Sequence, residues 1–483
     1  MSSSPTAAPA ARVPLQHILS FGTLGVPLAA MLVIYGVYLP RHYVSLGIDN
    51  FAAGTKAAFL AVTAAITLTR VFDVGLDPLV ALVMDRTKTP IGRYRPWLIM
   101  GVPLVLLGIY EVLMPTGHPT TFSLILWLVV TYAGMSMINI ALAAWSAVLA
   151  REYHDRSRVF AIQQAMGVLG SVAILTLPLF THGKIAAGVK SSMPILGLIL
   201  IIAFPIALAI CAGLTPERLG AVAQRPSFKM SDYLSALGRP SMARLVLADL
   251  LLTLGPGTTA PLYVYYFHDA KGFNIPDVGL LLIAYIGAGF VGAPFWGRLA
   301  SRFGKHRTVQ IACVAYSITQ TILMSLPKVS GHYTFSQSVP TVIGMFSVGF
   351  CASAFLLLVR SMIADVADEV KLEVKQDLTS LLFSMVTTTT KIGASITVLI
   401  VFPILAAVGY NGAEHAHNTP QAVFGLEMCY LFAPIILVWF GGAMFFGYKL
   451  DAKRHAEIRD ALAALDVAAA EESLVGPLSE AAE

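Results

Sequence analysis

Three charged side chains lie inside an apolar segment, 51–84, that is long enough to cross a lipid bilayer. They are Arg70, Asp73 and Asp77, and on a helix they share one face because residues three and four apart are surface neighbours. A charged side chain at the centre of a membrane helix costs roughly 2.5–3.5 kcal/mol on insertion scales. We therefore expect this face to contact protein, a cavity or an ion rather than lipid.

The composition of the whole chain is that of a membrane protein with many crossings. Of its 483 residues 57% are hydrophobic and only 12% are charged, and the mean hydropathy is +0.74. A soluble domain carries about 25% charged residues. We predict an all-α membrane protein with about twelve transmembrane helices of about 20 residues each. Apolar stretches predict these helices at 15–39, 51–84, 96–115, 121–149, 158–180, 193–214, 241–267, 276–299, 306–327, 338–364, 378–409 and 424–448.

The positive charges alternate between loops, which predicts how the chain lies in the membrane. Every second loop is rich in Lys and Arg, at 86–95, 151–158, 218–239, 298–307, 371–375 and 449–454. Loops with such an excess stay in the cytoplasm. We therefore expect a multi-pass protein of the cell inner membrane with both termini cytoplasmic.

A repeated motif indicates that the chain has two halves. A glycine followed by basic residues comes directly after the second apolar span, at 92–95, and after the eighth, at 304–307. A repeat at this offset is typical of two parallel helix bundles. The predicted parts are a disordered tail at 1–14, six-helix bundles at 15–214 and 241–449, a central cytoplasmic loop at 215–240 and a cytoplasmic tail at 450–483.

A longer pattern continues from the charged helix into the next loop and helix. It reads Arg70-x-x-Asp73-x-x-x-Asp77-Pro78, followed by Gly92-Arg93-x-Arg95-Pro96-Trp97. Matching pieces elsewhere are Ser20-Phe21-Gly22, Trp145-Ser146, Asp365-x-x-Asp368, Lys391-x-Gly393 and Gly409-Tyr410. With these residues the chain resembles the glycoside–pentoside–hexuronide:cation symporters, the melibiose-permease-like branch of the major facilitator superfamily. The resemblance implies that fold and the symport of a solute with H⁺ or Na⁺.

Asp73 and Asp77 are the predicted cation-coupling residues, together with Arg70 and Lys391. Two carboxylates one helical turn apart can share a proton or an alkali cation and release it as access alternates. The alternative is a structural ion pair of Arg70 with Asp73, which leaves Asp77 without a partner. Lys391 lies in the middle of an apolar helix, where an ammonium group needs an anionic partner; the alternative is that it reaches a membrane interface. Sodium-using relatives have a polar residue before the second aspartate, and Leu76 here favours a proton.

The predicted solute-binding residues are polar or aromatic positions within the apolar spans: Trp145, Gln163, Asn139, Tyr35 and Thr387. The alternatives are an interface position for Trp145 and helix–helix contacts for the others. In melibiose-type members charged residues hold the sugar, and the matching positions here are Pro27, Ala141 and Gln163. This loss disfavours a galactoside and leaves a more apolar pocket, so an amphiphilic or aromatic solute is an alternative to a sugar or glycoside.

Charged residues at the predicted cytoplasmic helix ends form a predicted gate, whose contacts form in one access state and break in the other. These residues are Asp85, Arg93, Arg95, Arg298, Arg302, Lys305, Asp365 and Asp368. Arg93 or Arg95 is expected to reach Asp365, Asp368 or Glu369 across the halves. The alternative is that the cations only anchor the loops in the cytoplasm.

The sequence favours a transporter over an enzyme. It has no P-loop, no Gly-rich dinucleotide turn and no His/Cys metal spacing, so we expect no metal and no cofactor beyond the coupling ion. The four cysteines lie in apolar segments and are expected to be buried free thiols. The predicted function is cation-coupled symport of a small organic solute by a monomer in the lipid bilayer, without nucleic acid. Transport of an amphiphile such as a lysolipid and a non-transporting sensor are the alternatives.

Overall fold

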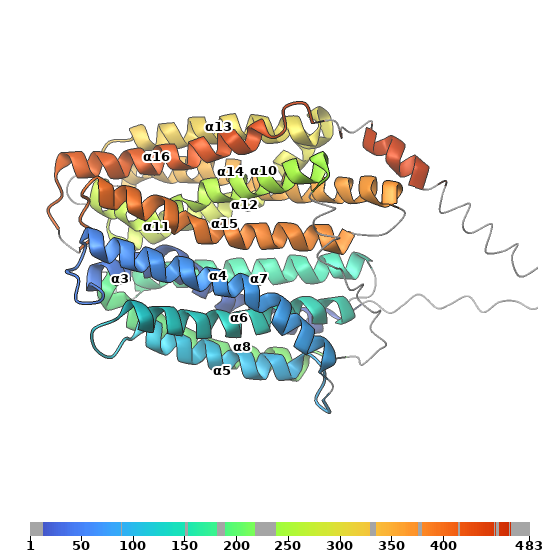
Figure 1. Cartoon of the computed structure of the whole chain (residues 1–483), viewed down its shortest axis with the longest axis horizontal. Coiled ribbons are helices and arrows are strands. Elements are labelled where there is room, and N and C mark those ends of the chain that lie inside the picture. Colours follow the sequence, from blue (N-terminus) through green and yellow to red (C-terminus); the bar gives the residue numbers. More distant parts are fainter. Residues whose placement is uncertain are drawn as a thin grey trace, which may run out of the picture. The chain divides into compact units, whose positions relative to one another are not determined.

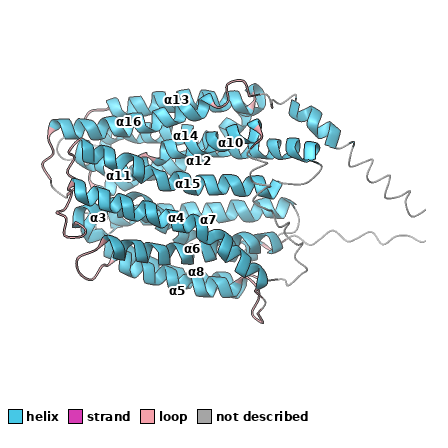
Figure 2. Ribbon diagram, in the orientation of Figure 1, coloured by secondary structure: helices cyan, strands magenta, loops and turns pink. Residues whose placement is uncertain are grey.

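The computed structural model describes residues 13–87, 89–149, 153–180, 189–217, 238–328, 335–374, 379–413, 416–448, 450, 454–462 and 464. Within these ranges the regular structure is helical, and Figure 2 shows no strand among them. A helix satisfies its own backbone N–H and C=O groups, which is the condition for crossing a hydrocarbon layer. The predicted all-α fold class is therefore confirmed.

The helices follow the predicted apolar spans closely. In the first half they are α1 (Leu15–Gly22), α2 (Gly25–Val33), η1 (Ile34–Tyr38), α3 (Leu39–Leu46), α4 (Lys56–Arg86), α5 (Arg95–Leu113), α6 (Thr121–Leu149), α7 (Tyr153–Phe180) and α8 (Val189–Leu214). In the second half they are α10 (Pro240–Gly257), α11 (Thr259–Val264), η2 (Tyr265–Ala270), α12 (Ile275–Phe303), α13 (Lys305–Ser325), α14 (Phe335–Val374), α15 (Thr379–Ala407) and α16 (Pro420–Ala443).

Among the described residues, eleven helices are long and apolar enough to span a membrane, and a shorter apolar helix covers Ala161–Leu177 in α7. Together they match the predicted crossings. The largest difference is at α14, which continues to Val374 although the apolar stretch ends near 364. The extension carries Asp365, Asp368 and Lys371, so it is a polar helix that hydropathy alone does not detect.

The first and seventh spans share a detail that repeats between the halves. Each contains a short π-helical segment near the end of the span, η1 in the first and η2 in the seventh. π-helical turns are rare and occur frequently at functional sites. η2 carries Asp269 and η1 is followed by Arg41 in α3, and these two residues form an ion pair.

The chain divides into two compact units, which differ from the two halves of the sequence. Unit 1 comprises 1–225, 260–283 and 398–426, and unit 2 comprises 226–259, 284–397 and 427–483. Unit 1 therefore includes parts of the second half, around η2 and the end of α15. The bundle boundaries predicted from the sequence stay a prediction.

Close helix packing in unit 1 places the α6 residues that matter for function. α6 packs against α4 and α5, and α5, α6 and α8 run side by side (Figure 1). A Cβ atom on Gly134 would lie 2.6 Å from the carbonyl oxygen of Gly101, so only glycine permits this approach of α6 to α5. Small residues at such contacts are typical of membrane helix packing. Ser136 follows two residues later on α6.

Candidate functional site

The predicted coupling carboxylates lie on α4 and converge on one hydroxyl group of α6. The Ser136 hydroxyl donates to Asp77 Oδ1 at 2.6 Å and lies 3.2 Å from Asp73 Oδ1. Asp73 and Ser136 are buried, and Asp77 is half-buried. Sequence reasoning found the two acids from their spacing but missed Ser136, which is far away in the chain. The arrangement brings several oxygen atoms together inside a membrane helix bundle.

Arg70 belongs to the same group of side chains. Its guanidinium lies 3.6 Å from Asp73 Oδ2 and 4.0 Å from the centre of the Tyr132 ring. A cation over an aromatic face is held by the ring quadrupole. Arg70 balances one of the two carboxylates, so Arg70, Asp73 and Asp77 together carry one negative charge when both acids are ionised. One proton or one monovalent cation neutralises that charge.

The other predicted coupling residue, Lys391, lies on α15 in unit 2 and is half-buried. Asp73 and Asp77 lie in unit 1. The expected pairing of Lys391 with these acids therefore stays a prediction. Thr387, one helical turn before Lys391, lies on the same helix, but its side chain is outside the described part of the structure.

Of the predicted solute-binding residues, Tyr35 is linked to the coupling carboxylates through Tyr132 and Arg70. Tyr35 is buried. Its ring packs edge to face against the Tyr132 ring, with 6.3 Å between the ring centres, and Arg70 stacks on the same Tyr132 ring. Asn139 is exposed on α6, three residues after Ser136. Gln163 is half-buried on α7, where a Cβ on Gly25 of α2 would lie 3.1 Å from the Gln163 carbonyl oxygen.

Trp145 is at a different place from these residues. Its ring is fully buried, its Nε1 donates to the carbonyl of Pro216 at 3.3 Å, and Phe21 meets it edge-on at 5.9 Å. The Arg95 guanidinium lies 5.8 Å from the ring centre. The indole therefore packs among residues of the predicted cytoplasmic end, and a role in stacking on a solute stays a prediction.

The first basic loop is organised by an acid that sequence reasoning did not select. The Glu217 carboxylate accepts hydrogen bonds from the backbone N–H groups of Arg93, Tyr94 and Arg95, where α5 begins. Free N–H groups at a helix start favour an anion. Gly92 has φ +123°, and a Cβ there would lie 2.1 Å from Glu217 Oε2, so the position requires glycine. Asp85 lies at the end of α4, and its side chain is outside the described residues.

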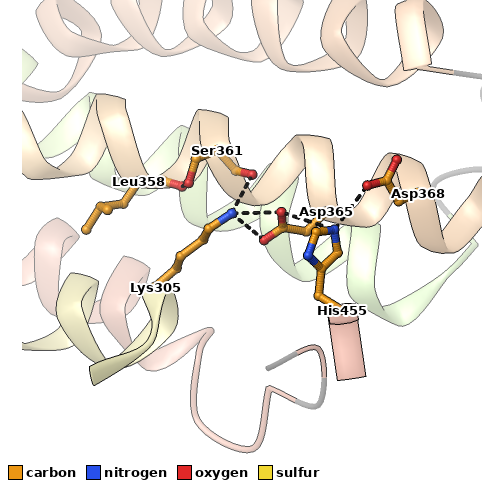
Figure 3. A network of polar contacts seen from close by, with 6 residues as sticks. All are labelled: Lys305, Leu358, Ser361, Asp365, Asp368 and His455. Atoms are coloured by element: carbon orange, nitrogen blue, oxygen red, sulfur yellow. Dashed lines mark hydrogen bonds and ion pairs between the residues drawn. The ribbon is translucent and has the colours of Figure 1, made fainter. Parts of the chain in front are cut away.

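In the second basic loop, Lys305 stands at the position that Arg93 has in the first loop. Lys305 Nζ donates to both Asp365 oxygens, at 2.6 and 2.7 Å, and to the carbonyl of Ser361 (Figure 3). His455, from the helix at 454–462, places Nε2 3.0 Å from Asp368 Oδ2 and 3.5 Å from Asp365 Oδ1. Lys305, Asp365 and His455, all in unit 2, border a cavity of about 340 Å³.

The remaining predicted gate residues lie outside this network. Arg298 and Arg302 are exposed near the end of α12, and Arg298 donates to the Pro294 carbonyl of its own helix. Arg93 and Arg95 lie in unit 1 and Asp365 and Asp368 in unit 2, so a contact across the halves stays a prediction. The role of His455 was not predicted, because nothing in the tail sequence indicates where its helix docks.

A charge cluster around a buried arginine in unit 1 was also missed. Arg41, which is 1% exposed, lies 2.7 Å from Asp269 Oδ1, and the Tyr410 hydroxyl donates to Asp269 Oδ2 at 2.7 Å. The Arg41 guanidinium also stacks on Tyr265, 4.9 Å from its ring centre. The cluster joins α3 of the first half to η2 and to the chain after α15. Arg41 is the buried member of the pair, and Asp269 is exposed. The cost of about 3–5 kcal/mol for breaking a buried ion pair is therefore an upper limit here.

The chain is similar to known transport proteins over most of its length. A family model described as MFS/sugar transport protein matches residues 20–452. The isoprimeverose transporter of Lactiplantibacillus pentosus is 27% identical, with 79% of each chain covered. The human sodium-dependent lysophosphatidylcholine symporter 1 is 23% identical, covering 82% of this chain and 77% of the human protein. A solved structure of a mutant of the nucleoside transporter NupG aligns with a TM-score of 0.64 at 15% identity, over 89% of this chain and 98% of that one.

Proposed function

Because the chain belongs to the MFS/sugar transport protein family and is a transporter rather than an enzyme, we propose that it is a cation-coupled symporter. In the proposed mechanism a small organic solute, a sugar or glycoside, moves with a monovalent cation by alternating access. The observation that carries this proposal is the pair of carboxylates on α4, one buried and one half-buried, that share the Ser136 hydroxyl. No resident cofactor is proposed, so the energy comes from the ion gradient.

The proposed coupling ion is a proton, with sodium as the alternative. One negative charge remains on Arg70, Asp73 and Asp77, and Ser136 has a single hydroxyl hydrogen to offer to two carboxylates. A proton on either acid removes their mutual repulsion. Leu76 adds no oxygen ligand beside Asp77, which favours a proton over an ion that needs several oxygens. Lys391 is proposed to compete with the ion for the same carboxylates.

The proposed solute site includes Tyr35, Asn139 and Gln163, with Thr387 from the second half. The Tyr35 ring contacts the Tyr132 ring, on which Arg70 stacks. A solute that contacts Tyr35 is therefore proposed to affect Arg70 through Tyr132. Trp145 is proposed to join the site only after the hydrogen bond from its Nε1 to the Pro216 carbonyl breaks. This order links solute binding to a change at the predicted cytoplasmic end.

The proposed gates lie at opposite ends of the transport path. Arg41, Asp269 and Tyr410 close the end opposite the basic loops. The loops at Gly92–Arg95 and Gly304–Arg307, with Glu217 and Asp365 as their acids, regulate the cytoplasmic end. Arg298, Arg302 and Asp85 are proposed to contribute in another access state. The proposed setting is a monomer in the cell inner membrane with both termini cytoplasmic, from the alternation of basic loops.

A two-step experiment tests this function. A thermal-shift screen of the purified protein against sugars, glycosides, uronates and lysophospholipids, with and without sodium, identifies a solute. Uptake of that solute into proteoliposomes is then driven by a pH gradient alone or by a sodium gradient alone. We expect the pH gradient to drive accumulation. Accumulation driven only by sodium would replace the proton with Na⁺, and equal uptake without either gradient would refute symport.

The alternative function is transport of an amphiphile such as a lysolipid. Positions that are charged in melibiose-type relatives are the apolar residues Pro27 and Ala141 here, and both are buried. A relative of similar coverage is named as a lysophosphatidylcholine symporter. Stabilisation by lysophospholipid and not by glycosides in the same screen would favour this function.

A further inference from the structure

Another carboxylate within a membrane span, Asp249, lies in unit 2, which also holds Lys391. It is near the middle of α10, within the apolar run Leu245–Leu252, and is only 2% exposed. An ionised carboxylate in such surroundings is costly unless charges and hydrogen bonds compensate it. The partners of Asp249 therefore decide what this residue does.

Asp249 has few partners in the described part of the chain. The Thr390 hydroxyl of α15 lies 3.3 Å from Asp249 Oδ2, but the same oxygen is 3.0 Å from the Val386 carbonyl, and it has one hydrogen to donate. Among the described residues no other side chain hydrogen-bonds to Asp249, and no Arg or Lys reaches ion-pair distance. The hydroxyl can also accept a hydrogen bond, which a protonated carboxyl group supplies.

The charges around Asp249 act at longer range. Arg360 of α14, a helix that packs against α10, attracts the carboxylate electrostatically but is itself exposed. Lys391 follows Thr390 on α15, and Arg244 lies five residues earlier on α10 and is exposed. α15 approaches α10 closely, since a Cβ on Gly393 would lie 3.4 Å from a Leu250 methyl carbon.

We propose that Asp249 is a second proton-binding group of the transport cycle, located in the second bundle. This inference rests on the proposed symport function. Within the described residues the site offers a single hydroxyl besides the carboxylate, which suits a proton and not a metal cation that needs several oxygen ligands. In the proton-loaded state the Asp249 acid donates to Thr390, which donates to Val386. In the other state Thr390 donates to the ionised carboxylate, after Asp249 has released its proton to water.

Infrared spectroscopy of the purified protein tests this without any solute. We expect the carbonyl stretch of a protonated carboxylic acid at neutral pH, lost in Asp249→Asn and shifted in Asp249→Glu. Asp73→Asn and Asp77→Asn should leave this band in place, which separates Asp249 from the first site. A spectrum of Asp249→Asn identical to that of the unchanged protein would overturn the proposal, whatever the fate of the coupling role of Asp73 and Asp77.

Proton-to-solute stoichiometry is the second readout. Proteoliposomes with a pH gradient of one unit lose about tenfold in maximal accumulation for each proton that is no longer coupled. We expect that loss in Asp249→Asn, with solute exchange retained and one proton fewer per solute. Asp460→Asn, an exposed acid of the helix at 454–462, is the matched control.

A purely structural role for Asp249 gives a different result. If Asp249 only balances Arg360, the double variant Asp249→Asn, Arg360→Gln should regain the original stoichiometry. If Asp249 carries a proton, the double variant should stay one proton short. Elution as a single species and retained solute exchange show that each variant is folded, and unchanged stoichiometry in folded Asp249→Asn would overturn the proposal.

Discussion

The two groups of membrane carboxylates are built in contrasting ways. Asp73 and Asp77 have the Ser136 hydroxyl and the Arg70 guanidinium beside them, and Arg70 stacks on a tyrosine ring. Arg70 therefore compensates part of the negative charge of this site. Asp249 is more deeply buried than Asp77, yet it has one shared hydroxyl and a distant arginine. The difference shows that an acid in a membrane helix can have several oxygen atoms around it, which suits a cation, or a single hydroxyl, which suits a proton. Local partners, rather than depth alone, distinguish the two.

The largest expected effect tests the first site. Asp77→Asn should abolish gradient-driven accumulation, because the site loses the charge that a cation neutralises and the solute can then cross without it. That leak would also dissipate any accumulation driven by a proton on Asp249. The measurement is solute accumulation in proteoliposomes under an imposed pH gradient, beside Asp249→Asn. If Asp249→Asn lowers solute accumulation as much as Asp77→Asn does, the distinction between the two sites is wrong, because the two acids would then belong to one coupled group.

A fully paired acid gives the next expectation. Asp269 has both Arg41 and Tyr410 as partners, so Asp269→Asn should leave the number of coupled protons unchanged. It should instead destabilise the protein by at most about 3–5 kcal/mol, because Arg41 stays buried without its counter-charge while Asp269 itself is exposed. Thermal unfolding in detergent measures the loss, with Asp460→Asn as control. A change in proton stoichiometry without loss of stability would contradict a structural role for this pair.

The Ser136 hydroxyl should have a smaller effect. The Ser136 hydroxyl donates to the Asp77 carboxylate and so stabilises its ionised form. Removing one hydrogen bond to a charged group costs about 1.5–3 kcal/mol, so Ser136→Ala should strengthen proton binding by roughly tenfold to a hundredfold. Ser136→Thr keeps the hydroxyl and serves as the matched variant. The dependence of uptake on external pH measures the affinity. Equal behaviour of the Ala and Thr variants would remove Ser136 from the site.

The smallest expected effect concerns Thr390. Replacing it with Val keeps the shape and removes the hydroxyl that lies beside Asp249, at a cost of about 0.5–1.5 kcal/mol. The pH at which the infrared carboxylic acid band disappears should move in Thr390→Val and stay in place in Thr389→Val, whose hydroxyl donates to the Met385 carbonyl of its own helix. A shift of the same size in both variants would argue against a specific Thr390–Asp249 interaction.

Much of the fold could be predicted because the membrane penalises every exposed backbone polar group. The apolar spans and the positive loops follow from that penalty, and the helices begin and end within a few residues of the predicted ranges in most places. The extension of α14 was missed because it is a polar helix beyond the apolar stretch. The short π-helical segments were missed as well, because hydropathy is blind to the local hydrogen-bond register.

The candidate site was predictable only where it is local. Asp73 and Asp77 are found from their spacing on one helix, and the glycines of the two basic loops from their repeat. Ser136, Glu217 and Asp269 meet their partners across long stretches of chain, and a single sequence carries no signal of such pairs. Asp249 was visible as an acid in an apolar run, but only its packing against Thr390 indicates a role.

The most direct test of the account compares exchange with accumulation in Asp73→Asn and Asp77→Asn. Proteoliposomes loaded with solute are assayed for exchange at equal pH and then for accumulation under a pH gradient. If these carboxylates couple the ion to the solute, exchange persists and accumulation is lost in both variants. Accumulation that equals that of the unchanged protein would contradict the central claim that the α4 carboxylates bind and release the coupling ion.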